Sequence, residues 1–402
     1  MNKPWENERW HVSLYNFTQE VREQMNLPER VLISDCTLRE GEQHPGVIFR
    51  KEDKLRLAHE LDEIGIPEIE IGTLAVSQEE REAAKAIAKA GLKAQIRVIC
   101  RAMKGDIDMA VDCGVPLISL SLPIGDIQLG YKLKWPEEKV IEKAGEIVNY
   151  AHQQGLRIVI SPLDLPRTNP DFLERYLKTI AAVGHVERVR LVDTVGSGTP
   201  LAMKYLVRKM IDITHLPIEM HCHNDFGLGT ANCLAGIEAG ASIASTSFNG
   251  MGERTGLAAT EEVALALQIL YGINLGLKFE NFYKLSLLLQ ELSNLKVQKH
   301  KPVVGENAFA QESGLVVSGW IANPLTAAPY LPEVVGQNAK LVLGKGSGKD
   351  SILWKLKQLG ITATDEQVAT ITARVKEEAE TTKSTVSDQI FEDICHQVIE
   401  TT

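Results

Sequence analysis

A short apolar run passes directly into a polar segment in the stretch VLISDCTLREGEQ, residues 31–43. The first four residues of this stretch have the β-branched, apolar character of a buried strand. Similar runs follow along the chain at 68–72, 95–100, 117–122, 157–161, 188–193, 217–221 and 243–248. Stretches with the apolar spacing of helices lie between them, for example 51–64, 79–90 and 199–213. The sequence therefore predicts eight strand–helix units.

Eight such units over about 220 residues predict a (β/α)8 barrel, the α/β fold known as the TIM barrel. A doubly wound open sheet is the alternative, but it needs a glycine-rich turn after its first strand. The segment 35–43, DCTLREGEQ, is not such a turn. We expect an N-terminal extension over 1–30, a barrel over 31–275 and a smaller helix-rich C-terminal region over 276–402. Four aromatic residues of the extension are expected to pack on the barrel: Trp5, Trp10, Tyr15 and Phe17.

The composition excludes several classes of partner. The 402 residues include 43 Lys plus Arg and 53 Asp plus Glu, which gives a net charge of −10. Because duplex binding needs a basic face, this balance argues against a nucleic-acid partner. No stretch approaches the roughly 18 uncharged apolar residues of a spanning helix, so we expect no membrane association. The 6 cysteines are dispersed without a CxxC pair, a pattern typical of a cytoplasmic protein.

Catalytic residues are expected where strands run into the following loops, because barrel enzymes place their active sites at that end. The segment 35–43 contains the negatively charged Asp35 and, four residues later, the positively charged Arg39. The carboxylate could bind a cation, and the guanidinium could bind an anionic substrate at the same strand end. The alternative is an ordinary surface loop that holds an Asp–Arg pair.

A second polar segment, HCHND at 221–225, follows the seventh run. The two-residue spacing of His221 and His223 places both imidazoles on one face of an extended chain. Together with Asp35 across the barrel, two imidazoles form a divalent-metal site that accepts Zn, Mn, Co, Fe or Mg. A lone histidine is more often a satisfied core residue. Cys222 lies between the two histidines and is expected to face the opposite way as inert core.

Other polar residues share the strand ends. The segment NGMGERTG at 249–256 follows the eighth run, and its glycines suit a tight turn whose amides approach a ligand. Each of these remaining candidates lies close to a strand end: Glu70, Arg101, Ser121, Asp164, Arg167, Asp193 and Thr194. Each is weak evidence alone, but their shared position favours a common site.

The segments 35–43, 221–225 and 250–256 resemble the signature segments of a family of metal-dependent barrels. That family includes isopropylmalate synthase, homocitrate synthase and HMG-CoA lyase. The C-terminal stretches 301–314 and 343–348 resemble the synthase branch rather than the shorter lyases.

This resemblance implies an enzyme that condenses acetyl-CoA with a short 2-oxo acid and then hydrolyses the thioester to release CoA. It implies that Asp35, His221 and His223 bind a divalent cation (Mn, Mg, Zn or Co), which the 2-oxo acid chelates. Arg39 neutralises the keto oxygen, where charge develops, and Thr194 holds the carboxylate. The substrate-binding set is Arg39, Gln43, Glu70, Arg101, Ser121, Arg167 and Thr194, and the catalytic set is Arg39, Glu40, Asp164 and Glu312. A homodimer is expected from the same resemblance.

The chain departs from the synthase pattern at positions that matter for proton transfer. Leu163 replaces the Glu of a Ser-x-Glu-Asp segment, and Gln311 and Val316 replace two C-terminal histidines. The missing Glu and first His are the pair that handles the acetyl proton in the family, and neither Leu nor Gln can titrate. Proton transfer therefore needs another group, such as Asp164, Glu312 or a metal-bound water.

These departures leave the substrate open. A Re-face citrate synthase acting on oxaloacetate and another alkylmalate-type synthase both fit the pattern. A metal-dependent carbon–carbon lyase of the HMG-CoA lyase type and a non-catalytic metal-binding relative are the alternatives outside the synthases.

Overall fold

The computed structural model describes residues 3–400 of the chain, which divide into two compact units. One unit is Ser13–Val297, and the other joins the described residues of Met1–Val12 to those of Gln298–Thr402. The sequence predicts a division near residue 275, whereas the helix that follows this point, α11 (Phe282–Ser293), belongs to the first unit. Among the described residues, none of the helices combines the length and apolar character that a bilayer span needs.

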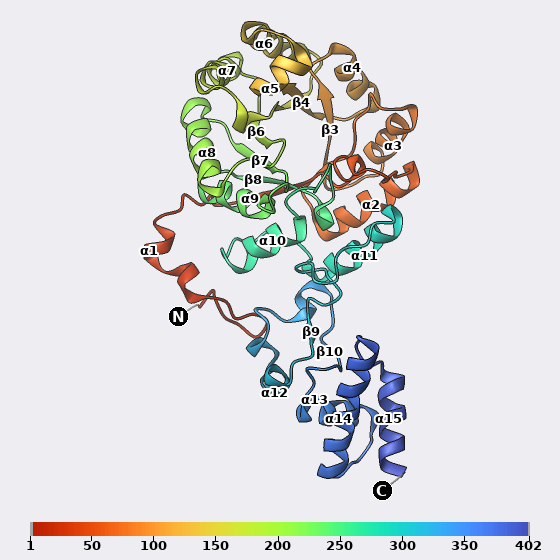
Figure 1. Ribbon diagram of the computed structural model, residues 1–402. Helices are drawn as coiled ribbons and strands as arrows, with labels where there is room; N and C mark the ends of the chain where they lie inside the picture. The colour runs from red at the N-terminus through yellow and green to blue at the C-terminus, as the bar shows by residue number, and fades with distance from the viewer. Residues whose placement is uncertain (1–2, 401–402) are drawn as a thin grey trace. The chain divides into compact units, whose positions relative to one another are not determined.

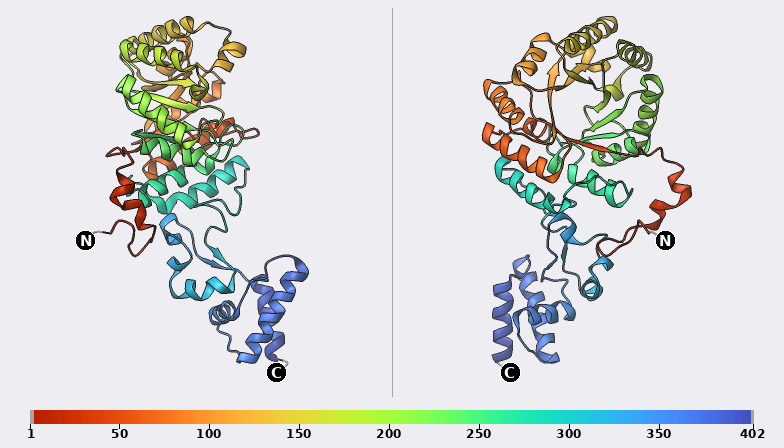
Figure 2. Two further views of the ribbon diagram at one scale, coloured as in Figure 1. Left: turned by 60° about the vertical axis from the view of Figure 1, so that its left-hand side comes forward. Right: turned by 180° about the vertical axis from the view of Figure 1, so that it is seen from behind.

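The first unit is built on parallel strands that pair in chain order and form a closed barrel when β8 pairs with β1. The strands are β1 (Leu32–Asp35), β2 (Glu68–Glu70), β3 (Gln95–Arg101), β4 (Leu117–Pro123), β5 (Arg157–Leu163), β6 (Arg188–Asp193), β7 (Ile218–Cys222) and β8 (Ile243–Thr246). Figure 1 shows helices on the outside of this barrel, and Figure 2 shows the same arrangement from two further sides. The predicted (β/α)8 barrel is confirmed, and the open-sheet alternative is wrong.

Helices return the chain from one strand to the next and cover the outside of the barrel. The helices of this unit are α1 (Gln19–Arg22), α2 (Lys51–Ile64), α3 (Gln78–Ala88), α4 (Lys104–Cys113), α5 (Asp126–Gln128), α6 (Glu137–Gln153), α7 (Pro170–Val183), α8 (Pro200–Thr214), α9 (Gly229–Glu238), α10 (Thr260–Ile269) and α11. The predicted helix 51–64 coincides with α2. Those at 79–90 and 199–213 coincide with α3 and α8 apart from one or two end residues.

The second unit is rich in helices, as the sequence predicts for the C-terminal region. Its elements are β9 (Ala310–Gln311), α12 (Gly314–Ala322), β10 (Lys340–Leu341), α13 (Lys349–Leu359), α14 (Asp365–Thr382) and α15 (Asp388–Glu400). β9 and β10 pair in parallel. The last three helices enclose a buried apolar cluster that includes Ile352, Ile371 and Phe391.

The N-terminal aromatic residues do not share one environment. Trp5 and Trp10 belong to the second unit, where Trp10 forms an antiparallel bridge with Tyr330. Tyr15 belongs to the barrel unit, but its side chain is 70% exposed. The large exposure of Tyr15 contradicts its expected packing on the barrel, and for Trp5 and Trp10, which belong to the second unit, that packing stays a prediction. Phe17 lies in the barrel unit, and the guanidinium carbon of Arg22 lies 4.7 Å from the centre of its ring.

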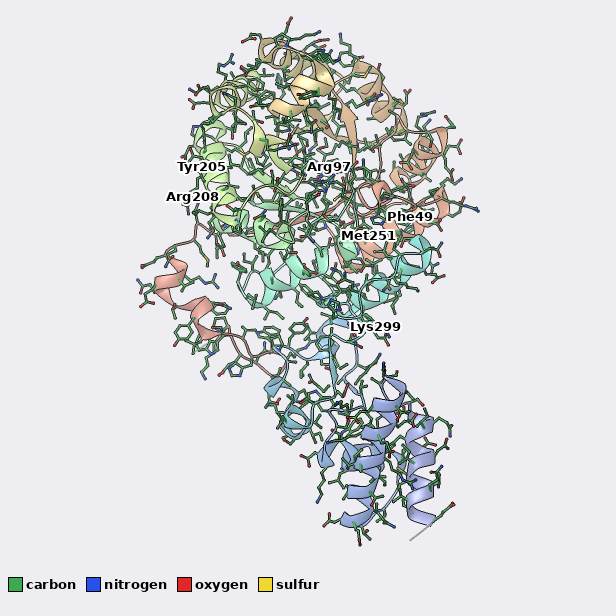
Figure 3. All side chains as sticks on the ribbon, viewed as in Figure 1. Phe49, Arg97, Tyr205, Arg208, Met251 and Lys299 are labelled. Atoms are coloured by element: carbon green, nitrogen blue, oxygen red, sulfur yellow. The ribbon has the colours of Figure 1, made fainter. Side chains whose placement is uncertain are left out.

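Charged side chains occupy part of the barrel interior, where TIM barrels usually stack branched apolar residues. Arg97 of β3 donates to both oxygens of Glu219 of β7, at 2.9 and 3.0 Å, so the two side chains meet across the barrel. Arg190 of β6 reaches Glu70 of β2 at 2.7 Å in the same way. All four residues are at most 1% exposed. Figure 3 labels Arg97 within the barrel.

Glu219 is the centre of this network. Its carboxylate also accepts hydrogen bonds from Nε of Arg188 and Nε of Arg190, each at 2.6 Å. Arg188 is paired in turn with Glu68. The members of the network occupy alternating strand positions, such as 68 and 70 or 188 and 190, and the two-residue period of a strand turns them all inward.

We expect a Glu219→Gln variant to lose about 3–5 kcal/mol of unfolding free energy, because the change leaves buried guanidinium groups without their shared carboxylate. Gln keeps the size of the side chain, so packing is little altered. Urea denaturation measures the loss. A matched control is Glu187→Gln, which breaks the exposed pair of Glu187 with Arg157 and is expected to cost less than about 1 kcal/mol. Equal losses in the two variants would contradict a stabilising role of the interior network.

Candidate active site

The loop after β1 delivers two charged side chains to the carboxyl end of the barrel. The amides of Arg39 and Glu40 both donate to the carbonyl of Cys36, at 3.1 and 2.7 Å, so the chain turns as soon as the strand ends. This turn brings both side chains back over the strands. Arg39 is 7% exposed and Glu40 is 2% exposed.

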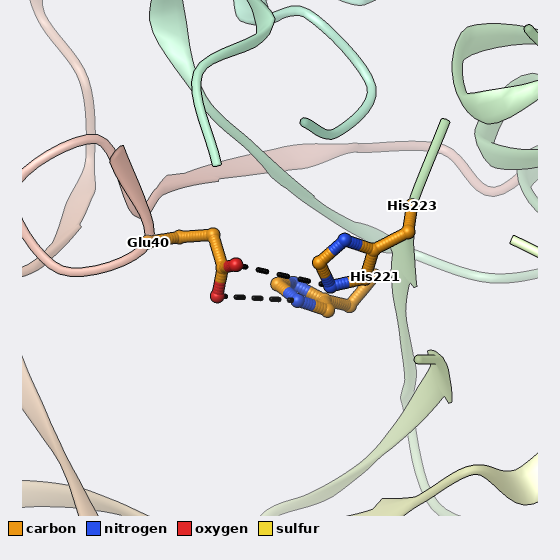
Figure 4. A group of neighbouring side chains, drawn as sticks. All are labelled: Glu40, His221 and His223. Atoms are coloured by element: carbon orange, nitrogen blue, oxygen red, sulfur yellow. Dashed lines mark ion pairs between the residues drawn. The ribbon is translucent and has the colours of Figure 1, made fainter. Parts of the chain in front are cut away.

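Glu40 faces the two histidines at the end of β7. Its Oε2 lies 4.0 Å from Nε2 of His221, and its Oε1 lies 3.8 Å from Nε2 of His223. One ligand atom from each residue lies within 4.8 Å of the other two, and all three residues are buried. Figure 4 shows the carboxylate and both imidazoles pointing toward one another.

These three side chains fit a divalent cation. Two atoms that each lie ~2.1 Å from one ion are at most about 4.2 Å apart, and both measured separations satisfy this limit. Nδ1 of His221 lies 3.0 Å from the Ser245 hydroxyl, which orients the ring and leaves Nε2 toward Glu40. Nδ1 of His223 is buried with no hydrogen-bond partner among the described residues. Two nitrogens and one oxygen form a donor set that zinc and other transition metals accept.

Both imidazoles are in the form that binds cations. Burial lowers the pKa of His221 well below its ordinary value, and the nearby Arg39 guanidinium adds to the effect. Burial likewise lowers the pKa of His223 to about 4, although Glu40 opposes the shift. Each ring is therefore neutral at neutral pH and offers a lone pair.

Asp35, the expected third ligand, lies outside this group. Its neighbour Ser34 points into the barrel, where the hydroxyl donates to a buried carboxylate of β2 at 2.7 Å. Successive side chains of a strand point to opposite faces, so Asp35 faces the helices. There it accepts hydrogen bonds from the Thr37 amide at 2.9 Å and the Thr260 hydroxyl at 2.8 Å, and burial raises its pKa to about 6. Glu40, and not Asp35, lies beside the imidazoles.

Arg39 is fixed next to Glu40. Its Nε donates to Glu70 at 2.5 Å, its Nη1 donates to Gln43 at 2.8 Å, and it pairs with Glu40. Burial alone would lower the pKa of Arg39, but the carboxylates of Glu70 and Glu40 raise it above its ordinary value. Nη2 donates to no acceptor among the described residues, so it is free to bind a substrate oxygen.

The segment 249–256 forms the tight turn that its glycines predict. Gly256 has a φ of 81°, and a Cβ atom there would lie 1.8 Å from the carbonyl oxygen of Gly250. The amide of Glu253 donates to Oε1 of Glu40 at 3.3 Å. The turn therefore helps to hold the Glu40 carboxylate in place.

A second polar group forms where β5 and β6 end. Asp164 follows β5 with a φ of 64°, and its two oxygens accept hydrogen bonds from Arg167, each at 2.8 Å. Its amide donates to the hydroxyl oxygen of Thr194 at 2.7 Å, which leaves the hydroxyl hydrogen of Thr194 free to donate. The carbonyl of Thr194 accepts from Arg254 at 2.7 Å. Asp193 is buried and accepts two amides of the loop after β6.

Three further site residues were expected from the sequence: Arg101, Ser121 and Glu312. Arg101 pairs with Asp106 at 2.8 Å and its side chain is 60% exposed. Ser121 is half-buried near the end of β4, in register with β5. Glu312 belongs to the second unit, where it accepts a hydrogen bond from the Gly346 amide at 3.0 Å.

Two supporting contacts were not predicted. Ser245 orients His221, and Arg190 holds the Glu70 carboxylate that fixes Arg39. The signal for both is strand alternation. Ser245 is the third residue of the predicted strand 243–248. Arg190 is two residues after Arg188 in the predicted strand 188–193, so the two arginines share one face of that strand.

Comparisons with known proteins agree with this fold. The family model described as HMGL-like matches residues 30–289, and the model described as homocitrate synthase post-HMGL domain-like matches residues 303–383. Among solved structures, the hydroxymethylglutaryl-CoA lyase from Pseudomonas aeruginosa superposes with a TM-score of 0.61 at 20% identity, covering 68% of this chain and 96% of the lyase. At that identity, the likeness shows the fold alone.

Curated relatives are more similar in sequence. The homocitrate synthase AksA of Methanopyrus kandleri is 42% identical over 384 residues, 96% of each chain. A probable 2-isopropylmalate synthase of Ignicoccus hospitalis is 44% identical over 87% of this chain and 88% of its own. The (R)-citramalate synthase CimA of Methanocaldococcus jannaschii is 42% identical over 86% of this chain and 70% of its own. The chain therefore belongs to the HMGL-like family, in the branch that contains the homocitrate, isopropylmalate and citramalate synthases.

Proposed function

We propose that the chain is a divalent-metal-dependent acyltransferase that condenses acetyl-CoA with a short 2-oxo acid and hydrolyses the thioester to release CoA. The observation that carries the proposal is the buried group of Glu40, His221 and His223 with the Arg39 guanidinium beside it. Relatives named homocitrate, 2-isopropylmalate and citramalate synthases, at 40–44% identity, support the same reaction class.

Glu40, His221 and His223 would hold the cation, which supplies a Lewis acid and a template for a 2-oxo acid. The free Nη2 of Arg39 donates to the keto oxygen, where negative charge develops as the new carbon–carbon bond forms. The hydroxyl of Thr194 keeps its hydrogen and donates it to the substrate carboxylate. Both donors are fixed by other contacts before substrate arrives, so little reorganisation is needed.

A carboxylate of this chain removes the proton from the acetyl methyl group in the proposed reaction. Leu163 and Gln311 stand where the family has a titratable pair. We assign the role to Asp164 or Glu312, as the sequence suggests. Asp164 is the candidate within the barrel unit, and Arg167 holds both of its oxygens at the strand end.

The proposal includes a cytoplasmic homodimer that binds neither nucleic acid nor membranes. The net charge of −10 supports the absence of a nucleic-acid partner. All 6 cysteines are free and buried, which is consistent with a reducing compartment.

A thiol-release assay tests the reaction. The purified chain is incubated with acetyl-CoA, Mn²⁺ or Mg²⁺, and in turn oxaloacetate, 2-oxoglutarate, 2-oxoisovalerate, pyruvate or glyoxylate. We expect CoA release with at least one 2-oxo acid, none without a 2-oxo acid, and loss of activity with a chelator. Absence of release with all five contradicts the synthase. Cleavage of a 3-hydroxy acyl-CoA would then indicate the lyase direction.

A further inference from the structure

Arg254 joins three loops at the carboxyl end of the barrel. It lies in the turn 249–256, which follows β8. Its Nη2 donates to the carbonyl oxygen of Thr194, directly after β6, at 2.7 Å. Its Nε and Nη2 also donate to the two carboxylate oxygens of Asp225, in the loop after β7, at 2.9 and 3.0 Å. One guanidinium therefore connects the loops that follow the last three strands.

The contacts of Arg254 are more specific than those of an ordinary surface arginine. Its side chain is 38% exposed, and a single exposed ion pair contributes little to stability. Here, however, the guanidinium binds Asp225 through two parallel hydrogen bonds, a planar arrangement that fixes the direction of the side chain. The backbone of Arg254 has a φ of 57°, in the left-handed region, which residues other than glycine rarely adopt and which is enriched at functional sites. The guanidinium is therefore held in one orientation, toward Thr194.

The loop after β6 is packed tightly against the loop after β7. Gly196 has a φ of 58°, and a Cβ atom there would lie 2.8 Å from the amide nitrogen of Asp225 and 2.9 Å from the carbonyl oxygen of His223. Only glycine allows the two backbones to approach so closely. The position of Thr194, two residues before Gly196, is therefore set relative to the backbone of His223.

Thr194 is held at both of its oxygen atoms. Arg254 binds its carbonyl oxygen, and its hydroxyl oxygen accepts the Asp164 amide at 2.7 Å. We propose that Arg254 is a positioning residue that orients the Thr194 hydroxyl toward the carboxylate of the 2-oxo acid. This inference rests on the proposed function, in which Thr194 donates to that carboxylate. Arg254 acts through Thr194 and touches no reacting atom.

A variant that lacks the guanidinium should keep the form of the turn. The turn is closed by backbone hydrogen bonds, such as that from the Gly256 amide to the Glu253 carbonyl at 2.9 Å. Arg254→Met keeps most of the length of the side chain and removes its donors. We therefore expect a folded protein in which only the guanidinium contacts are lost.

Steady-state kinetics of Arg254→Met, with a 2-oxo acid that gives CoA release, test the proposal. We expect the KM for the 2-oxo acid to rise about tenfold, as when one hydrogen bond to a charged group is lost. The carboxylate takes no part in bond making, so kcat and the KM for acetyl-CoA should stay within about twofold of wild type. The matched control is Arg175→Met, which breaks exposed ion pairs between α7 and α6 and should change none of these constants. An unchanged KM for the 2-oxo acid in Arg254→Met overturns the proposal.

A double-mutant cycle with Thr194→Val shows whether Arg254 acts through Thr194. Thr194→Val removes the hydroxyl and should by itself raise the KM for the 2-oxo acid about tenfold. In that background, Arg254→Met should add less than about a further twofold, because the group that it positions is already gone. Independent effects that multiply to about a hundredfold would show that Arg254 acts elsewhere, and they would overturn the proposal.

Hydrogen exchange of the free protein separates this inference from the proposed function, because it needs no substrate. The amides of Gly196, Ser197 and Gly198 donate to Asp193, so they exchange when the loop opens. Measured by mass spectrometry, their exchange should be about tenfold faster in Arg254→Met and unchanged in Arg175→Met. Faster exchange without CoA release from any 2-oxo acid would support the hold on the loop and contradict the acyltransferase. Unchanged exchange together with acyl transfer would overturn the positioning role and leave the acyltransferase standing.

Discussion

A His223→Ala variant is expected to lose its divalent cation and at least about 100-fold of its acyl-transfer rate. Alanine offers no ligand atom, and the two remaining donors cannot hold an ion as firmly as three. Glu40→Gln is expected to act in the same direction, because it removes the only negative charge of the Glu40, His221 and His223 group. Metal content after dialysis against Mn²⁺ is measured by mass spectrometry, and the rate is measured by thiol release.

Two matched variants show whether the loss is specific. Asp35→Asn should keep the cation, because Asp35 faces the helices and bonds to Thr37 and Thr260. His59→Ala removes an exposed histidine of α2 and should keep both metal and rate. One ion per chain in His223→Ala, or metal loss in Asp35→Asn with retention in Glu40→Gln, would show that the ligand assignment is wrong.

The barrel could be predicted because its signal is local. Each strand is a short apolar run, and helices such as α2 place their buried residues at the helical period. Because strands that follow one another in a (β/α)8 barrel pair with each other, the order of the strands follows from the fold class. The division between units could not be predicted in the same way, because Trp10 bridges to Tyr330 and no local pattern marks a partner so far along the chain.

The histidines could be predicted and the carboxylate could not, for one physical reason. His221 and His223 are two residues apart, so their common direction follows from the strand period alone. The direction of Asp35 depends on which face of β1 is inside, and this is fixed by Ser34 and its bond to Glu68. The sequence alone does not show which face of β1 is inside, so it does not show that Asp35 faces the helices and that Glu40 lies beside the imidazoles.

The interior charges have a similar explanation. Glu68 and Glu70, or Arg188 and Arg190, alternate with apolar residues, a pattern that also fits a strand with one solvated face. Only closure of the barrel turns that face inward and sets Arg97 of β3 opposite β7. The network then reaches the candidate active site, because Glu70 bonds to both Arg190 and Arg39.

Replacing Arg39 is expected to lower kcat by about 10²–10³, the usual loss when one fixed donor to a developing oxyanion is removed. Arg39→Lys keeps the charge, but a single ammonium cannot bond to Glu70 and Gln43 and still present a free donor to substrate. We therefore expect Arg39→Lys to fall nearly as far as Arg39→Ala. Both are measured by thiol release at saturating acetyl-CoA.

Chemical rescue distinguishes a direct role of Arg39 from a structural one. Guanidinium ion added to Arg39→Ala should restore part of kcat, because a free guanidinium can occupy the vacated position beside Glu70. It should not affect a control, Arg157→Ala, whose arginine lies at the start of β5 and pairs with Glu187 near the surface. Glu70 keeps its ion pairs with Arg97 and Arg190 when Arg39 is removed, so its carboxylate stays compensated and we expect the barrel to stay folded. Wild-type kcat in Arg39→Lys would show that charge alone is sufficient, and the donor geometry argued for Nη2 would then be wrong.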